Sequence, residues 1–449
     1  MTKILVSENK LDELVKPNKP LTAPAFRRNE MWTYFGPAFV ASVAYIDPGN
    51  FATNIEGGSR FGYRLLWVLL WSNAMAILIQ YLSAKLGIVT GLTLPQNCRK
   101  HFSRPMTLFL WVAAEVSAIA TDLAEFLGAA LGFYLLVGPA MLAHGWSRTE
   151  TLLAAALVSA VTVFLILALD LAGYQWLERG IMAFVGVIGL CYGFEVFLVH
   201  PDWKLAAFHV LVPRLDPKDL HGSLYVAVGM LGATVMPHVV YLHSALVQPR
   251  REELIAKPPI EGGSRRRSYL RFELIDVFVA MNGAWLINSA MIVMAAVAFG
   301  HLSNPVTTIE QAHQTLGPLL GPFAATVFAV ALLCSGVSSS TVGVMAGQVI
   351  IEGFLDIKFS IFLRRLITII PAIIVIAIGL DPLKILILSQ VVLSFTLPFA
   401  LIPLLVLTNR SSVMRSFVSA RRTRWAGWCA VAIILSLNVV LLGQLAFGQ

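Results

Sequence analysis

The sequence is poor in charge and in cysteine. Only 13% of its 449 residues are Asp, Glu, Lys or Arg, whereas 57% are hydrophobic. Soluble domains carry about 25% charged residues, so this composition excludes an ordinary soluble protein. The four cysteines, Cys98, Cys191, Cys334 and Cys429, show no CxxC spacing. They predict neither a disulfide framework nor a structural zinc site.

The motifs of common enzymes are missing as well. The sequence has no HExxH, no phosphate loop, no nucleophile motif and no long hydrophilic stretch for a sizeable soluble domain. Its apolar runs are continuous and about twice as long as the alternating segments of a membrane β-barrel. We therefore expect an all-α polytopic membrane protein with neither enzymatic activity nor cofactor. The net charge of +8 is attributed to loop topology, not to nucleic-acid binding.

Eleven apolar runs are long enough to be membrane-spanning helices. The densest basic cluster, Arg250–Arg271, follows the sixth run, whereas the loop His301–Pro318 has no Lys or Arg. Because basic residues collect in cytoplasmic loops, we expect the N-terminus in the cytoplasm and the C-terminus outside. The predicted spans are Met31–Gly57, Leu65–Val89, Pro105–Leu127, Leu152–Leu171, Gly180–Val199, Leu224–Val247, Val277–Phe299, Phe323–Ile351, Ile367–Gly379, Ile385–Leu407 and Trp425–Phe447.

Two of these runs are interrupted. The first holds DPGN at Asp47–Asn50, and the sixth holds MPH at Met236–His238. Proline removes a backbone donor and glycine tolerates non-helical dihedral angles, so both helices are predicted to break there. The breaks lie five spans apart, which suggests two inverted five-helix repeats with a site between them.

The two breaks offer ligands for a metal ion. Asp47 and Asn50 supply a carboxylate and an amide oxygen, and Met236 supplies a thioether. Unwound backbone at Ala44 and Ala233 adds carbonyl oxygens. One sulfur among oxygens favours Mn²⁺, Fe²⁺, Co²⁺ or Cd²⁺ over hard cations. The alternatives are that Met236 only packs against neighbouring side chains, and that Asp47 either forms a structural ion pair with an arginine or caps a helix backbone.

The third run carries three acidic residues on one face. Glu115, Asp122 and Glu125 are spaced seven and three residues apart, which brings them to the same side of a helix. Carboxylates in a membrane span are typical of a proton path or a wet vestibule. A structural network neutralised by arginine is the alternative.

Histidine and arginine residues are further candidates for proton transfer. His238 and His243 lie in the sixth run, and imidazole titrates near neutral pH. A hydrogen-bonded core histidine is the plainer interpretation of each. Arg364 and Arg365 open the ninth run, where they either anchor the helix at the cytoplasmic surface or pair with the acids of the third run.

Two amides lie inside apolar runs. Gln390 is in the tenth run and Asn288 is in the seventh. A buried amide needs hydrogen-bond partners, which either a neighbouring helix or a bound cation supplies. We expect the stronger case for a cation at Gln390.

These motifs together resemble the Nramp family of proton-coupled divalent transition-metal transporters, of the bacterial manganese and iron importer type. The match is carried by DPGN at Asp47–Asn50, TDLAEFLGAALG from Thr121, and MPH at Met236–His238 followed by YLHS. SGVSSSTVG from Ser335 and SQVVLSF from Ser389 also match, and the resemblance covers nearly the whole chain.

The resemblance implies a LeuT-like fold of eleven transmembrane helices, in which helices 1 and 6 are broken and the first ten form the inverted repeat. It also implies a metal site, joined in some states by Gln390, and a route by which protons leave. One departure is Val239-Val240, where many relatives have Asn-Leu. The implied metal ligands are Asp47, Asn50, Met236, Ala44, Ala233 and Gln390, and the implied proton residues are Asp122, Glu125, His238, Arg364 and Arg365.

The expected function is symport of protons with Mn²⁺, and with Fe²⁺, Co²⁺ and Cd²⁺, into the cytoplasm by alternating access. Relatives that handle magnesium or aluminium lack the methionine that stands here at Met236. The alternative is a sodium-coupled amino-acid transporter on the same scaffold. Asp47 counts against it, because an anionic substrate beside a buried anion is unfavourable.

The chain is expected to be organised as two repeats with short additions. A cytoplasmic tail covers residues 1–30, the first five-helix repeat 31–200, the inverted second repeat 201–408, and a cytoplasmic loop with the eleventh span 409–449. The expected location is the plasma or inner membrane. Expected partners are divalent metal ions, protons and the lipid bilayer, with no nucleic acid. A monomer is the working expectation.

Overall fold

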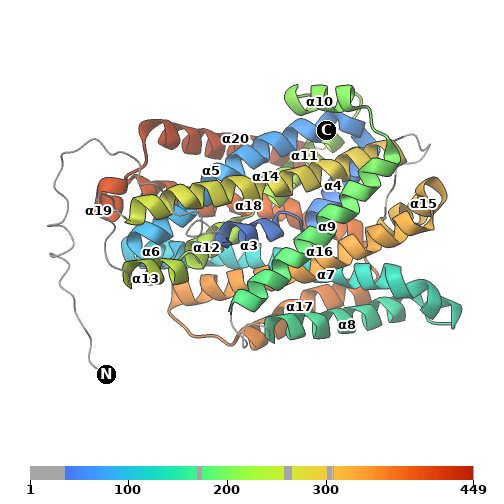
Figure 1. The fold of residues 1–449 in the computed structure, drawn as a ribbon, viewed down its shortest axis with the longest axis horizontal. Coiled ribbons are helices and arrows are strands. Elements are labelled where there is room, and N and C mark those ends of the chain that lie inside the picture. The colour runs from blue at the N-terminus through green and yellow to red at the C-terminus, as the bar shows by residue number, and fades with distance from the viewer. Residues whose placement is uncertain (1–35, 169–173, 257–264, 301–305, 307, 448–449) are drawn as a thin grey trace.

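The structure, a computed structural model, describes residues 36–168, 174–256, 265–300, 306 and 308–447. Within these ranges every regular element is a helix. The long helices run mostly along the long axis of the molecule, and short helices lie at its two ends (Figure 1). The long helices each contain an apolar stretch of at least 18 residues, except α17, which is shorter; such a stretch is the pattern of helices that span a membrane.

Each of the eleven predicted spans corresponds to a helix or a helix pair. Nine stretches of the described chain are long and apolar enough to cross a membrane. One of them, Pro48–Thr90, joins the second half of the first span to the second span. The helix of the ninth predicted span has 17 residues, which makes it too short to be one of these nine stretches. The spans are α3 (Pro37–Ala44) with α4 (Pro48–Phe61), α5 (Leu66–Thr90), α7 (Arg104–Ala143), α8 (Arg148–Ala168), α9 (Tyr174–Val199), α11 (Leu220–Thr234) with α12 (Pro237–Leu246), α14 (Arg265–Phe299), α16 (Pro322–Leu355), α17 (Ile361–Ala377), α18 (Pro382–Asn409) and α20 (Arg421–Phe447).

The first span is broken as predicted, and the irregular stretch begins two residues before the DPGN motif. α3 ends at Ala44, and α4 begins at Pro48, so the irregular residues are 45–47. Proline in a helix interior costs about 3 kcal/mol, but at the first helical position its missing N–H is not needed. Pro48 therefore starts a helix, and Asp47 caps it.

The sixth span breaks in the same way. α11 ends at Thr234, and α12 begins at Pro237 with Met236 as its N-cap residue. In an unbroken helix the backbone N–H at position 48 would donate to the carbonyl of Ala44, and the backbone N–H at position 237 would donate to the carbonyl of Ala233. Because proline has no N–H, each break leaves that carbonyl without its helical donor.

α7 is the longest helix that the structure describes, with 40 residues. It continues beyond the predicted end of the third span, Leu127, to Ala143. α7 packs against α16, α8, α18 and α17. A Cβ on Gly128 would lie 2.1 Å from Cβ of Pro48, and one on Gly132 would lie 2.6 Å from Cα of Leu333. The two glycines therefore let α7 contact the first break and α16 closely.

Several short helices were not predicted as elements. They join the spans at the two ends of the molecule, with α6, α13 and α19 at one end and α10 and α15 at the other (Figure 1). The predicted N-terminal tail lies outside the described residues, and the predicted repeat boundaries stay predictions. These connecting elements are η1 (Gly62–Leu65), α6 (Leu94–His101), α10 (Trp203–Leu211), α13 (Gln248–Ala256), α15 (Ile309–Leu320), α19 (Ser411–Met414) and η3 (Arg415–Phe417).

Candidate metal site

Asp47 and Asn50 form a compact pair at the first break. Oδ1 of Asp47 accepts hydrogen bonds from the backbone N–H of Asn50 at 2.8 Å and from its Nδ2 at 2.7 Å. Both side chains are fully buried. The capping role that was the alternative interpretation of Asp47 is thus present, but it uses only one carboxylate oxygen.

Asn50 also ties the first break to the second. Its Nδ2 donates to the carbonyl oxygen of Ala233 at 3.0 Å. This is the carbonyl that Pro237 leaves without a helical donor. The contact brings the ends of α4 and α11 together, so the two irregular segments face each other across one site.

Gln390 of α18 completes this cluster because two glycines leave room for it. A Cβ on Gly49 would lie 1.8 Å from Nε2 of Gln390, and one on Gly232 would lie 2.1 Å from the backbone oxygen of Gln390. The amide therefore lies directly against the start of α4. Its Nε2 donates to Ser389 Oγ at 3.2 Å.

Three buried oxygens at this site have no donor. Oδ2 of Asp47, Oδ1 of Asn50 and Oε1 of Gln390 accept no hydrogen bond from any described residue. Leaving such oxygens unsatisfied costs about 1–3 kcal/mol each, so three of them on neighbouring side chains make this position a candidate cation site. Met236 and Ala44, the other predicted ligands, are also fully buried at the two breaks.

The described residues contain no cluster of three or more His, Cys, Asp or Glu that could hold a metal. The predicted ligand set differs from such clusters because it has one carboxylate, and its other members are amide and carbonyl oxygens and a thioether. A sulfur among oxygens favours transition-metal cations over hard ones.

A second polar group extends from the site along α7. Thr121 Oγ1 lies 3.0 Å from Nδ1 of His238, whose Nε2 has no partner among the described residues. A Cβ on Gly343 of α16 would lie 2.2 Å from Oε2 of Glu125 and 3.0 Å from Oδ1 of Asp122. Gly343 therefore makes room for both carboxylates, which are fully buried.

The arginines of α17 pair with the acids of α7. Nη1 of Arg364 lies 3.0 Å from Oε1 of Glu115, and Nη1 of Arg365 lies 3.8 Å from Oδ1 of Asp122. Arg365 also donates to Ser340 Oγ. The acids and the arginines thus form one buried network, as both the proton path and the structural alternative require.

His243 belongs to a different group of hydrogen-bonded residues from His238. Its Nδ1 lies 2.9 Å from Gln80 Oε1, and its Nε2 lies 2.9 Å from Glu273 Oε1. Gln80 in turn donates to the hydroxyl of Tyr45 at 2.6 Å, beside the first break. The structure therefore separates His243 from the group of His238, although both histidines lie on α12.

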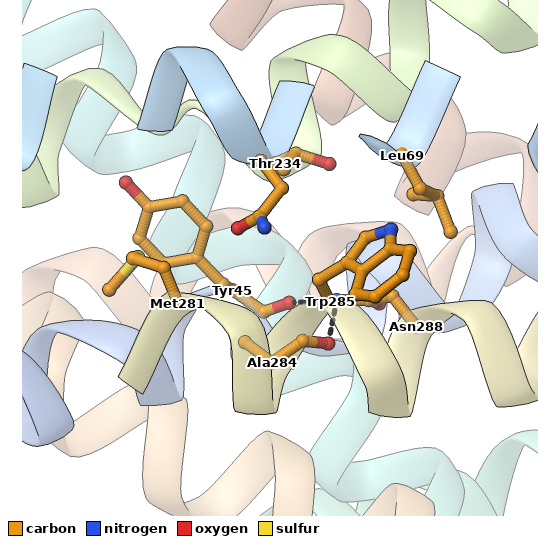
Figure 2. Close-up of a pocket in the computed structure, with 8 residues that line it drawn as sticks. Tyr45, Leu69, Thr234, Met281, Ala284, Trp285 and Asn288 are labelled. Atoms are coloured by element: carbon orange, nitrogen blue, oxygen red, sulfur yellow. Dashed lines mark hydrogen bonds between the residues drawn. The ribbon is translucent and has the colours of Figure 1, made fainter. Parts of the chain in front are cut away.

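A small cavity adjoins both breaks. Figure 2 shows Tyr45 and Thr234, which follow Ala44 and Ala233, facing α14 across it. The space open to the centre of a water molecule is about 10 Å³, enough for a single water. Asn288 lines the cavity and donates to the carbonyl of Tyr45 at 2.6 Å (Figure 2). Its partners are therefore neighbouring helices, including Asn54, which donates to it at 2.7 Å.

Two acids of α14 were missed by the sequence analysis. Glu273 contacts His243, and Oδ2 of Asp276 accepts from the backbone N–H groups of Gly36 and Ala38 at 3.1 and 3.0 Å. Asp276 thus caps α3. The seventh span was predicted to begin at Val277, which left both acids in a loop, whereas the helix begins twelve residues earlier. Their i, i+3 spacing beside aromatic residues was the available signal.

Glu195 was also missed. It lies in α9, is fully buried, and neither carboxylate oxygen has a partner among the described residues. The signal was an acidic residue inside the predicted fifth span, which is the same kind of signal that identified Asp47.

Comparison with known proteins agrees with this arrangement. The model of the natural resistance-associated macrophage protein-like (Nramp) family matches residues 38–444. The divalent metal cation transporter MntH of Deinococcus radiodurans is 49% identical over 417 residues, which are 92% of this chain and 90% of that protein. MntH of Caldanaerobacter subterraneus subsp. tengcongensis is 47% identical over 411 residues, 91% and 92% of the two chains.

Solved structures give the same result. A crystal structure of the Eremococcus coleocola manganese transporter covers 95% of this chain and 90% of its own, with 31% identity and a TM-score of 0.79. The nucleobase-cation-symport-1 family transporter Mhp1 is only 12% identical and covers 92% of both chains, with a TM-score of 0.57. That likeness concerns the fold alone and identifies it as LeuT-like. The chain belongs to the Nramp family, a family of transporters and not of enzymes.

Proposed function

We propose that this protein imports divalent transition-metal ions, Mn²⁺ above all and also Fe²⁺, Co²⁺ and Cd²⁺, into the cytoplasm together with protons. The observation that carries the proposal is that three neighbouring residues, Asp47, Asn50 and Gln390, each have a buried oxygen without a donor among the described residues. The names of the relatives, divalent metal cation transporters and a manganese transporter, support the same substrate class.

The metal would be held by the free oxygens of these three side chains, by the carbonyls of Ala44 and Ala233, and by the sulfur of Met236. In the structure the Ala233 carbonyl accepts a hydrogen bond from Nδ2 of Asn50. A cation at the site would replace that hydrogen bond, since an amide presents either its nitrogen or its oxygen to a neighbour. The thioether favours transition metals over Ca²⁺ and Mg²⁺.

Protons would move through the network on α7. Charge interactions connect Glu125 with Asp47 on one side and with Asp122 and Arg365 on the other. A metal at Asp47 changes the field at Glu125, which provides a physical link between metal binding and proton release. His238 adjoins Thr121 on the same helix face and extends the path.

Alternating access follows from the two breaks. α3 has only eight residues and is tied to α14 through the Asp276 cap. α3 is buried against α14, α16, α12 and α9, and because it ends at the break it can move separately from α4. We place the protein in the cytoplasmic membrane, with α6, α13 and α19 on the cytoplasmic side.

Metal binding to the purified protein tests the site without requiring transport. Calorimetric titration with Mn²⁺ and Cd²⁺ should detect one site in the wild type and none in Asp47→Asn. Asp356→Asn is the matched control, because it removes a carboxylate that is 78% exposed on the surface. Equal binding by Asp47→Asn and the control would disprove the assignment of the site.

A further inference from the structure

Seven basic side chains are exposed at the end of the molecule that carries α6 and α19. They come from the end of α6 and the start of α7, from the connection between α18 and α20, and from the first turn of α20. None of them forms an ion pair with a residue that the structure describes. We call this surface the basic rim, and its residues are Lys100, Arg104, Arg410, Arg415, Arg421, Arg422 and Arg424.

Acidic residues are absent from both chain segments that build the basic rim. The sequence has no Asp or Glu between residues 57 and 114, and none from 382 to its last residue, 449. Ion pairs occur at both ends of the molecule: Arg60 pairs with Asp219 at 2.6 Å at the opposite end, and Arg99 of α6 pairs with Asp356 at 2.8 Å at this one. The rim consists of the exposed basic residues beside Arg99 that have no such acidic partner among the described residues.

The two segments of the rim contact each other. The guanidinium carbon of Arg410 lies 5.7 Å from the ring centre of Phe102, between α6 and α7. The pKa of the neighbouring His101 is lowered, first by partial burial and then by the positive charges of Lys100 and Arg410. Part of the lowering of the His101 pKa therefore comes from the positive charges of the basic rim.

Large apolar side chains are exposed next to these basic residues, on α20 and on α7. On α20, Trp425 and Trp428 are 63% and 39% exposed, within two turns of the arginines. On α7, Met106 and Phe109 are 47% and 51% exposed, just after Arg104. Tryptophan beside arginine at the end of a spanning helix is the pattern of the headgroup region of a bilayer.

We propose that the basic rim binds the phosphate groups of anionic phospholipids, with the glycerol and upper acyl chains against the exposed aromatic residues. The N-terminus of α7 strengthens the site for an anion, because the Ser103 side chain does not cap it. A zwitterionic lipid binds less well, since its own cation offsets the phosphate. Basic clusters beside a transmembrane helix attract anionic lipids in this way.

The test uses the full-length protein in detergent and native mass spectrometry. Phosphatidylglycerol should bind in preference to phosphatidylcholine, and Arg421→Gln/Arg422→Gln should weaken phosphatidylglycerol binding on the order of tenfold. Lys204→Gln/Lys218→Gln, which removes two exposed charges at the opposite end, should leave it unchanged. Arg421→Lys/Arg422→Lys should retain it, which shows that a loss in the glutamine variant is not misfolding.

A second measurement reports on the site directly. In nanodiscs that contain phosphatidylglycerol, the pKa of His101, followed by NMR, should rise relative to phosphatidylcholine nanodiscs, because an anion offsets Lys100 and Arg410. The proposal would be overturned if the two lipids bound equally. It would also be overturned if Arg421→Gln/Arg422→Gln and Lys204→Gln/Lys218→Gln lost binding equally, or if the pKa of His101 were the same in both nanodiscs. Displacement of the lipid by millimolar inorganic phosphate would also do so, since the site would then recognise a free anion.

Discussion

At the scale of single residues, the site depends on one carboxylate whose two oxygens have different tasks. Oδ1 of Asp47 caps α4 and binds Asn50, whereas Oδ2 is free. An asparagine at this position would keep an oxygen for the cap but would lose the negative charge. This division allows the structural and the metal-binding roles of the residue to be separated by mutation.

We therefore predict that Asp47→Asn folds but does not transport Mn²⁺. A dehydrated divalent cation without any carboxylate ligand binds far too weakly. The measurement is Mn²⁺ uptake into proteoliposomes at matched protein content, with the melting temperature as a control for folding. Near-normal uptake by this variant would refute the role given to the carboxylate.

Met236→Ala should change metal selectivity more than it lowers transport. Without the thioether the site keeps oxygen ligands and gains room for water, which suits Ca²⁺ and Mg²⁺ better. Cd²⁺ should lose most affinity, and Ca²⁺ should begin to compete with Mn²⁺. A relative loss of about 1.4 kcal/mol appears as a tenfold change in the competition ratio. Uptake of Mn²⁺ against rising Cd²⁺ and Ca²⁺ measures it; unchanged ratios would reduce Met236 to a packing residue.

The sequence was most informative where a polar residue stands in an apolar run. Asp47, Asn50 and Gln390 are of this kind, and the structure brings them together. Asp276 could not be predicted in its role, because it caps a helix whose start lies 240 positions away. The partner of His243 was missed for a related reason, since Glu273 lies before the predicted start of its helix.

At the scale of elements, the position of the first break is fixed by the packing of α7. Gly128 is in contact with Pro48, the first residue of α4. Proline and glycine patterns were sufficient to predict two broken helices with irregular backbone before each proline, although Ala44 and Ala233 themselves still belong to α3 and α11. The short helices between the spans were missed because their sequences are too brief to show a clear period.

Gly128→Ala should impair transport because its new Cβ would lie 2.1 Å from Cβ of Pro48 and force α4 away from α7. Overpacking of this kind typically costs about 1–3 kcal/mol. Gly193→Ala on α9 is the matched control, since a Cβ there meets nothing within 4 Å. Melting temperature and Mn²⁺ uptake should fall only in the first variant; equal behaviour of the two would mean that this contact does not position the break.

At the scale of the whole molecule, the candidate metal site and a set of buried titratable residues lie in one core. The family resemblance predicted both sets, and in the structure Gly343 leaves the space for Glu125 and Asp122; the connection of the two sets through Glu125 is our proposal. The connection could not be read from the sequence, because it depends on a glycine of α16 that no charge pattern identifies.

Glu125→Gln should weaken the pH dependence of transport more than its metal affinity. The variant keeps the shape of the side chain but holds no exchangeable acid proton at that position. Uptake of wild type should rise as the outside is acidified, while that of the variant should change less. If Mn²⁺ affinity fell and the pH profile kept its slope, Glu125 would belong to the metal site and not to the proton path.

The central claim, that metal and protons move together through this molecule, is tested most directly in proteoliposomes with internal pH and Mn²⁺ recorded at the same time. We predict that Mn²⁺ entry is accompanied by acidification of the interior, needs no sodium, and that both signals disappear in Asp47→Asn. Mn²⁺ entry without proton influx at every metal gradient and voltage would contradict the account.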